Sequence, residues 1–264
     1  MRLVPRWSRH AAPDAVLDAA GAAGGPDRWL LRWAALHAPH DWSSLGRRAS
    51  LAPGERNEMQ LYDHPDCPYG MKVRIALAET ECDYETVRVD LAAGQQHSAE
   101  FLKINPFGQV PVLIDDSLVL YDSTIINEYL NEWYASEPGL LPDLEHAPER
   151  ARVRLLEDFA DRAFTPAVMA LEAEQAKPEG ERNGERVSAL IETIEKALPM
   201  LERVLSEQQF LGPNFSLADI AFAPAALRLE RLGVDPGEAH KNVKDWLTRL
   251  AGRPSIMTVL EMAA

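Results

Sequence analysis

The sequence of 264 residues has little cysteine, a shortage of positive charge and no long apolar run, and each shortage excludes a class of protein. Two cysteines, Cys67 and Cys82, cannot form the disulfide framework of a secreted domain and favour a reducing compartment such as the cytoplasm. No apolar run approaches the roughly 18 to 20 residues of a membrane-spanning helix. Because 27 Lys and Arg face 41 Asp and Glu, the net charge of −14 argues against direct binding to nucleic acid or to an anionic membrane.

Lysine is absent from residues 1–58, which carry eight Arg and six acidic residues and therefore a net charge of +2. The other 206 residues carry the acidity of the chain. A helix is predicted at 27–38, but glycine and proline surround it and leave too little sequence to build a core. We expect residues 1–58 to be a disordered extension, or sequence upstream of a true start at Met59. Asp14, Asp18 and Asp27 disfavour a transit peptide, because such peptides are poor in acidic residues.

From Met59 the pattern becomes regular and predicts an α/β domain over residues 59–138. The expected order is strand, helix, strand, a connecting stretch, then a hairpin and a final helix. The predicted strands are 60–62, 84–89, 110–114 and 118–121, and the predicted helices are 69–79 and 125–133. A helix between the first two strands indicates a parallel pair, whereas the short spacing of the last two strands indicates a hairpin.

The remainder, residues 147–264, lacks any good strand candidate and predicts an all-helical domain. Helices are expected at about 149–176, 185–208, 216–232, 241–251 and 254–262. Ser216 and Asp219 form a capping-box pattern at the start of the third of these helices.

Cys67 is the residue most suited to chemistry. It directly precedes Pro68 on the turn that opens the first helix, where free backbone N–H groups and the helix dipole favour a thiolate. We therefore expect an acidic, reactive thiol; the competing interpretation is a small buried cysteine. Position 70 is glycine, so the second thiol of a C-x-x-C motif is absent. Cys82 cannot replace it, because the intervening helix of some 15 residues spans roughly 22 Å and bridged Cα atoms lie within about 7 Å.

The chain from Met59 onward resembles the cytosolic glutathione transferases, which join a thioredoxin-like α/β domain to an all-helical domain. Three signatures carry the resemblance, and the Ser216–Asp219 box adds a fourth. They are Cys67-Pro68-Tyr69-Gly70, the run Asn105-Pro106-Phe107-Gly108-Gln109-Val110-Pro111-Val112-Leu113, and Tyr121-Asp122-Ser123-Thr124-Ile125-Ile126.

The resemblance implies glutathione as a cosubstrate, no metal, and a set of binding residues. It implies a cis bond before Pro111, which would turn the backbone of Val110 toward the cysteinyl part of glutathione; an ordinary proline at a strand start is the alternative. Asp122 and Ser123 would meet the γ-glutamyl ammonium and carboxylate, although Ser123 could instead cap the helix. His97 stands where related enzymes place a Lys for the glycine carboxylate. The full implied set is Pro68, Tyr69, His97, Gln109, Val110, Pro111, Asp122 and Ser123, with Cys67 as the catalytic residue.

Cys67 decides the reaction class that the resemblance implies. Cysteine-type members, including the omega class, form a mixed disulfide with glutathione, so we expect monothiol transfer in which a second glutathione restores the thiol. Beta-class members also carry a cysteine, and conjugation to a small electrophile stays open. Tyr62 and Tyr69 are competing hydroxyl groups. Family precedent implies a homodimer.

A second resemblance points to an interaction protein. Residues 74–79, 125–130 and 215–233 are similar to stringent starvation protein A, a relative that binds RNA polymerase and lacks transferase activity. That relative has lost the Cys-Pro motif, so Cys67 and Pro68 favour the enzyme over the interaction protein.

Overall fold

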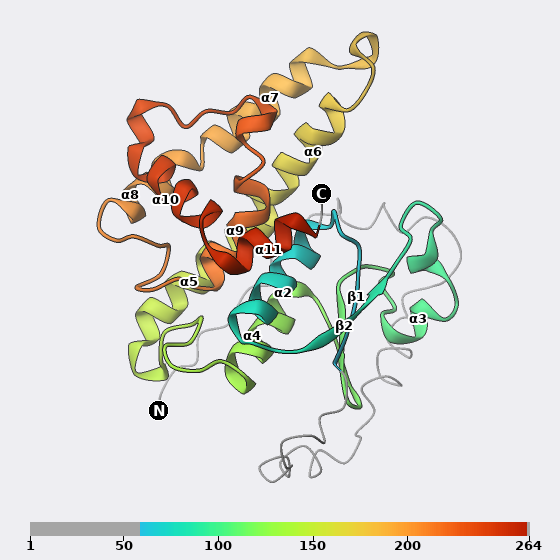
Figure 1. Ribbon diagram of the computed structural model, residues 1–264. Helices are drawn as coiled ribbons and strands as arrows, with labels where there is room; N and C mark the ends of the chain where they lie inside the picture. Colours follow the sequence, from blue (N-terminus) through green and yellow to red (C-terminus); the bar gives the residue numbers. More distant parts are fainter. Residues whose placement is uncertain (1–58, 263–264) are drawn as a thin grey trace, which may run out of the picture. The chain divides into compact units, whose positions relative to one another are not determined.

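The computed structural model describes residues 59–262, and the predictions for the extension before Met59 lie outside the described residues. The first half is a four-stranded sheet with helices on both faces (Figure 1). Its elements are β1 (Met59–Asp63), α2 (Pro68–Glu79), β2 (Tyr84–Arg88), α3 (Phe101–Ile104), β3 (Val112–Asp115), β4 (Leu118–Tyr121) and α4 (Ser123–Trp133). The strand order is β2-β1-β3-β4, with β1 and β2 parallel and the other pairs antiparallel. The predicted parallel pair and hairpin are both confirmed.

Side-chain alternation along the strands divides the sheet domain into two apolar layers. Leu61 and Leu113 face one side of the sheet and join the main core with α2 and α4. Their neighbours Tyr62 and Val112 face the other side and pack with Phe101 of α3. Figure 1 shows α3 on the side of the sheet opposite α2 and α4. The sheet is therefore covered on both faces, as the predicted α/β class requires.

The second half is helical throughout its described residues, as predicted. Its helices are α5 (Ala147–Phe159), α6 (Thr165–Gln175), α7 (Gly184–Glu195), α8 (Leu198–Leu205), α9 (Leu217–Ala226), α10 (Lys241–Ala251) and α11 (Pro254–Glu261). Asp219 at the start of α9 is fully buried and completes the predicted capping box. Its carboxylate also accepts hydrogen bonds from the Leu211 amide and from the Trp246 indole, each at 2.9 Å.

Three helix predictions in this half were wrong in detail. The expected helix at 149–176 contains a π-helical turn, Ala160–Phe164, between α5 and α6. The expected helix at 185–208 is two helices, because Pro199 lies in the first turn of α8 and lacks the N–H that a continuous helix needs. The expected helix at 216–232 ends at Ala226 and is followed by a separate 3-10 turn, Glu230–Leu232.

The two halves share one core through α2. This helix packs against α4 of the sheet domain and against α9 and α11 of the helical domain. Arg253, just before α11, forms two hydrogen bonds to the Glu79 carboxylate at the end of α2, both at 2.6 Å. Its guanidinium lies 3.7 Å from the centre of the Phe215 ring. The helix that begins at Cys67 is thus held from both sides.

Candidate functional site

Cys67 is the N-cap residue of α2. The chain leaves β1 at Asp63 and turns, with the Cys67 amide donating to the His64 carbonyl at 3.0 Å. Pro68 then occupies the first turn of the helix, where its missing N–H costs nothing. The predicted strand, turn and helix around Cys67 are therefore confirmed.

The Cys67 side chain lines a cavity of about 660 Å³. All but one of the lining residues belong to the sheet domain, and Asp161 of the π-helical turn is the exception. The lining is Cys67, Tyr69, Leu91, Gln96, Asn105, Phe107, Gly108, Gln109, Val110, Pro111, Tyr121, Asp122, Ser123 and Asp161. Seven of the nine residues proposed from the sequence lie on this one surface; Pro68 and His97 do not.

The wall opposite Cys67 is the loop before β3. The peptide bond between Val110 and Pro111 is cis, as the resemblance implied. The Cys67 thiol donates to the Val110 carbonyl oxygen across a sulfur–oxygen distance of 3.9 Å. The buried Asn105 side chain fixes this loop by donating to the Gln109 carbonyl at 2.7 Å. A rigid backbone edge therefore lies beside the thiol.

The far end of the cavity is the start of α4. Asp122, not Ser123, is the N-cap residue: its Oδ1 accepts from the amides of Thr124 and Ile125 at 2.9 and 3.2 Å. Asp122 has a φ of +74°, which is uncommon for a residue other than glycine and is found preferentially at functional sites. Ser123 is 5% exposed, and its hydroxyl makes no hydrogen bond within residues 59–262. A hydroxyl that lines the cavity beside a helix N-terminus is suited to binding a carboxylate.

The residues predicted from the sequence differ from the observed lining at His97 and Asp161. His97 is exposed and packs beside Gly108, while its neighbour Gln96 reaches the cavity instead. His97 lies next to the lining of the cavity, and its role toward a ligand carboxylate stays a prediction. Asp161 was missed, because nothing in the helical pattern of residues 149–176 distinguishes a residue that faces the other domain.

Burial in the folded chain opposes the acidic thiol that the helix N-terminus predicts. Burial raises the pKa of Cys67 to about 11, and the nearby Asp63 carboxylate raises it further. The N–H groups of Gly70 and Tyr69 lower the pKa, as the helix N-terminus should, but burial outweighs them. The sequence indicated the helix terminus correctly and gave no measure of burial.

We expect alkylation of Cys67 by iodoacetamide, followed in the Cys82→Ser variant, to rise about tenfold per pH unit between pH 7 and pH 10, because the reactive thiolate is a small fraction below its pKa. Mass spectrometry of the Cys67 peptide measures the rate. A rate that levels off below pH 8 would show that the thiol is acidic after all.

A buried ion pair lies beneath the first turn of α2. Asp63 and Arg74 are each 2% exposed, and the Arg74 Nε lies 3.0 Å from the Asp63 Oδ2. Burial raises the pKa of Asp63 to about 6, although Arg74 lowers it. A Cβ atom added to Gly70 would lie 1.7 Å from the Asp63 Oδ1. The position of a second thiol is therefore filled by a carboxylate.

Gly70→Ala should destabilise the fold by about 1–3 kcal/mol or more, because the new methyl group overlaps a buried carboxylate that is held by Arg74. Urea unfolding measures the loss. Gly180→Ala is the matched control, since no atom lies within 4 Å of its added Cβ. Equal stability of the two variants would mean that Asp63 moves aside without cost.

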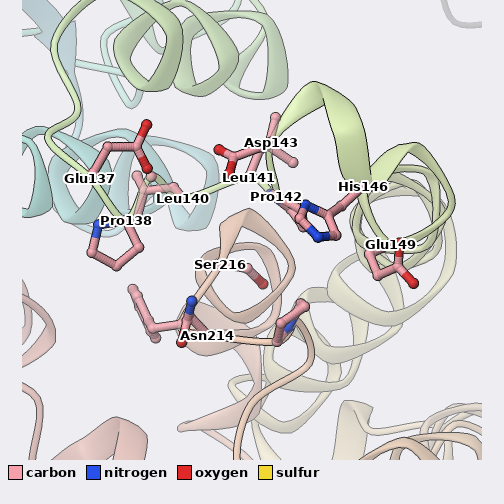
Figure 2. Close-up of a pocket in the computed structure, with 13 residues that line it drawn as sticks. Glu137, Pro138, Leu140, Leu141, Pro142, Asp143, His146, Glu149, Asn214 and Ser216 are labelled. Carbon is pink, nitrogen blue, oxygen red and sulfur yellow. The ribbon is translucent and has the colours of Figure 1, made fainter.

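A second, smaller pocket of about 190 Å³ lies between the linker that follows α4 and the start of α9 (Figure 2). It contains none of the nine catalytic and binding residues proposed from the sequence. Within residues 59–262, no group of three or more His, Cys, Asp or Glu side chains could hold a metal ion. The same part of the chain has no helix that is both long and apolar enough to cross a membrane.

Comparison with known proteins gives evidence about the family of the chain that does not depend on the geometry of the cavity. The family model described as the N-terminal domain of glutathione S-transferase matches residues 57–132, and the model of the C-terminal domain matches residues 159–254. A stringent starvation protein A homolog from Pasteurella multocida is 34% identical over 214 residues, which cover 81% of this chain and 95% of that protein. Glutathione S-transferase 3 from Zea mays is 34% identical over 206 residues, covering 75% and 90%. The solved glutathione transferase URE2P8 from Phanerochaete chrysosporium, with oxidized glutathione, superposes with a TM-score of 0.71 at 26% identity, covering 80% and 97%.

Proposed function

The chain belongs to the glutathione S-transferase family, and from this premise we propose that it is a glutathione-dependent enzyme of the cysteine type whose reactive group is Cys67. One observation carries the proposal: the Cys67 thiol lies at a helix N-terminus in the same cavity as Val110, Asp122 and Ser123. Each of these residues offers a group that glutathione can use. The cavity volume of about 660 Å³ suits a ligand of tripeptide size.

The groups on the cavity surface match the parts of glutathione in order. The γ-glutamyl end carries an ammonium and a carboxylate, for which Asp122 and the Ser123 hydroxyl offer partners. The central cysteinyl residue would pair with the backbone of Val110, which places its sulfur toward Cys67. Gln109, Pro111, Tyr69 and Gln96 complete the surface, while Pro68 acts only by starting the helix.

The reaction that we favour is thiol transfer. The Cys67 thiolate attacks the glutathionyl sulfur of a mixed disulfide, forming a Cys67–glutathione disulfide and releasing the substrate as a thiol. A second glutathione thiolate then attacks the glutathionyl sulfur, which releases Cys67 and leaves oxidised glutathione. Because this step consumes reduced glutathione, we place the enzyme in a reducing compartment, the cytoplasm.

Conjugation is the second candidate, and the raised pKa of Cys67 favours it. A thiol that stays protonated can donate a weak hydrogen bond to the sulfur of a bound glutathione thiolate. The glutathione sulfur would then attack a small electrophile directly. Thiol transfer makes a covalent bond to Cys67, whereas conjugation does not.

Calorimetry with reduced glutathione tests glutathione binding, the step that thiol transfer and conjugation share. We expect binding at millimolar or lower concentration, and we expect oxidised glutathione to leave a mixed disulfide on Cys67 that mass spectrometry detects. The absence of binding heat at millimolar glutathione would contradict the proposal of a glutathione-dependent enzyme. It would favour the interaction protein that the similarity to stringent starvation protein A implies.

We also propose that the enzyme is a homodimer. Five large apolar side chains of the described residues are more than half exposed, among them Leu144 at 81% and Leu155 at 69%. The others are Phe107, Ile125 and Trp133. Four of the five lie on or beside α4 and α5, which are joined by an ion pair between Glu128 and Arg154. A surface of this kind is suited to a second copy of the chain, and sedimentation as a monomer would contradict it.

A further inference from the structure

Lys72 is a lysine buried between the two domains. It lies on α2, only five residues after Cys67, and its side chain is 1% exposed. An ammonium group in such a position needs anionic and hydrogen-bonding partners, because an isolated buried charge is strongly unfavourable. The partners of Lys72 therefore show which segments the buried charge holds together.

The hydrogen-bonding partners of Lys72 come from α4 and from the π-helical turn. The Lys72 Nζ donates to both carboxylate oxygens of Asp161, at 2.9 and 2.7 Å, and to the Thr124 hydroxyl at 3.3 Å. The Thr124 hydroxyl in turn donates to the Asp161 Oδ2 at 3.0 Å. Lys72, Thr124 and Asp161 thus form a closed triangle, which we call the interdomain triangle.

The interdomain triangle touches the proposed glutathione site on two sides. Thr124 directly follows Asp122 and Ser123 and lies in the first turn of α4, whose amides Asp122 caps. Asp161 lines the cavity, and its backbone carbonyl accepts from the Tyr69 hydroxyl at 3.5 Å. The π-helical turn of Ala160–Phe164 is the local irregularity that carries Asp161.

Glu157 is the other carboxylate beside Lys72. Its Oε1 lies 3.6 Å from the Lys72 Nζ, and neither oxygen has a hydrogen-bond partner within the described residues. Burial raises the pKa of Glu157 to about 7, although Lys72 lowers it. Glu157 lines no part of the cavity. It therefore shares the burial of the triangle but, unlike Asp161, does not line the cavity.

We propose that the interdomain triangle positions the first turn of α4, so that Asp161 of the helical domain sets the affinity of the sheet domain for glutathione. The proposal rests on the proposed function, since it assigns Asp122 and Ser123 to the γ-glutamyl end. Lys72, Thr124 and Asp161 are positioning residues: they act through the helix terminus and not on the reacting sulfur atoms.

The experiment compares three single variants by calorimetry with reduced glutathione. Thr124→Val keeps the shape of the side chain and removes its hydroxyl, and we expect about tenfold weaker binding, as for one lost hydrogen bond to a charged group. Thr124→Ser restores the hydroxyl and should restore wild-type affinity. Glu157→Gln removes the other carboxylate beside Lys72 and should leave the dissociation constant within about twofold.

Amide hydrogen exchange of the ligand-free protein tests the same inference without glutathione. We expect the amides of Ile125 and Ile126 to exchange at least about tenfold faster in Thr124→Val than in the wild type, with no change in Thr124→Ser. A wild-type protein that binds no glutathione but shows this exchange pattern would refute the proposed function and, with it, the assigned effect on affinity. Unchanged exchange and unchanged affinity in Thr124→Val, or an equal loss of affinity in Glu157→Gln, would overturn the role of the triangle.

Discussion

Cys67→Ser should reduce glutathione-dependent thiol transfer by at least about a hundredfold, because a serine hydroxyl cannot form the mixed disulfide on which the reaction depends. Glutathione affinity should change little, since the cavity and the helix N-terminus stay in place. The measurement is the rate of reduction of a glutathionylated substrate at saturating glutathione, with the dissociation constant determined separately.

The same variant separates the two candidate reactions. A serine hydroxyl can still donate a hydrogen bond to a glutathione thiolate, so conjugation should persist in Cys67→Ser. Cys82→Ser is the control, because Cys82 lies beyond the far end of α2, where the Thr80 hydroxyl approaches its sulfur at 3.3 Å. Full thiol transfer by Cys67→Ser would remove Cys67 from the mechanism.

Asp219→Ala should destabilise the protein by about 3–5 kcal/mol, the largest loss of stability that we expect from a single substitution outside the cavity. Asp219 is fully buried, and four donors converge on its carboxylate. They are the amides of Leu211 and Ser216, the Ser216 hydroxyl and the Trp246 indole, at 2.8 to 2.9 Å. Removal of the carboxylate leaves these groups without a partner in the core. Urea unfolding at neutral pH measures the change.

Asp245→Ala is the matched control for Asp219→Ala. Asp245 is also an aspartate on a helix of this domain, but it is half exposed and pairs with Lys241, one helical turn away. A solvated pair of this kind contributes little, so the urea midpoint should not move measurably. Similar midpoints for both variants would show that the cap of α9 carries no special stability.

The sheet domain could be predicted closely because its signals are local. A short apolar run after a polar turn marks β4, which was predicted with its observed ends, and a proline after Cys67 marks the start of α2. The helical domain was predicted in class but not in its breaks. The π-helical turn was not predicted, because its one extra residue disturbs the helical spacing only locally and the apolar pattern resumes after it.

Most residues of the proposed site could be predicted from short motifs, but the pKa of Cys67 could not. The sequence places Cys67 at a helix N-terminus, where the dipole lowers a thiol pKa, whereas burial and the Asp63 carboxylate come from chain segments folded around it. Asp161 illustrates the same limit across the domain boundary. It reaches the cavity from the π-helical turn, where it bonds Lys72 and Thr124 of the sheet domain, contacts that no local pattern encodes.

The carboxylate of Asp63 against Gly70 has a consequence for the kinetics of any thiol transfer at Cys67. With no room for a neighbouring thiol, the covalent intermediate cannot resolve within the molecule and must wait for a collision with free glutathione. That step is first order in glutathione below saturation, so turnover follows the cellular concentration of the reduced form. A dithiol enzyme of the same fold would resolve its mixed disulfide at a unimolecular rate that does not depend on glutathione. In this chain the rate of that step would rise and fall with the concentration of reduced glutathione.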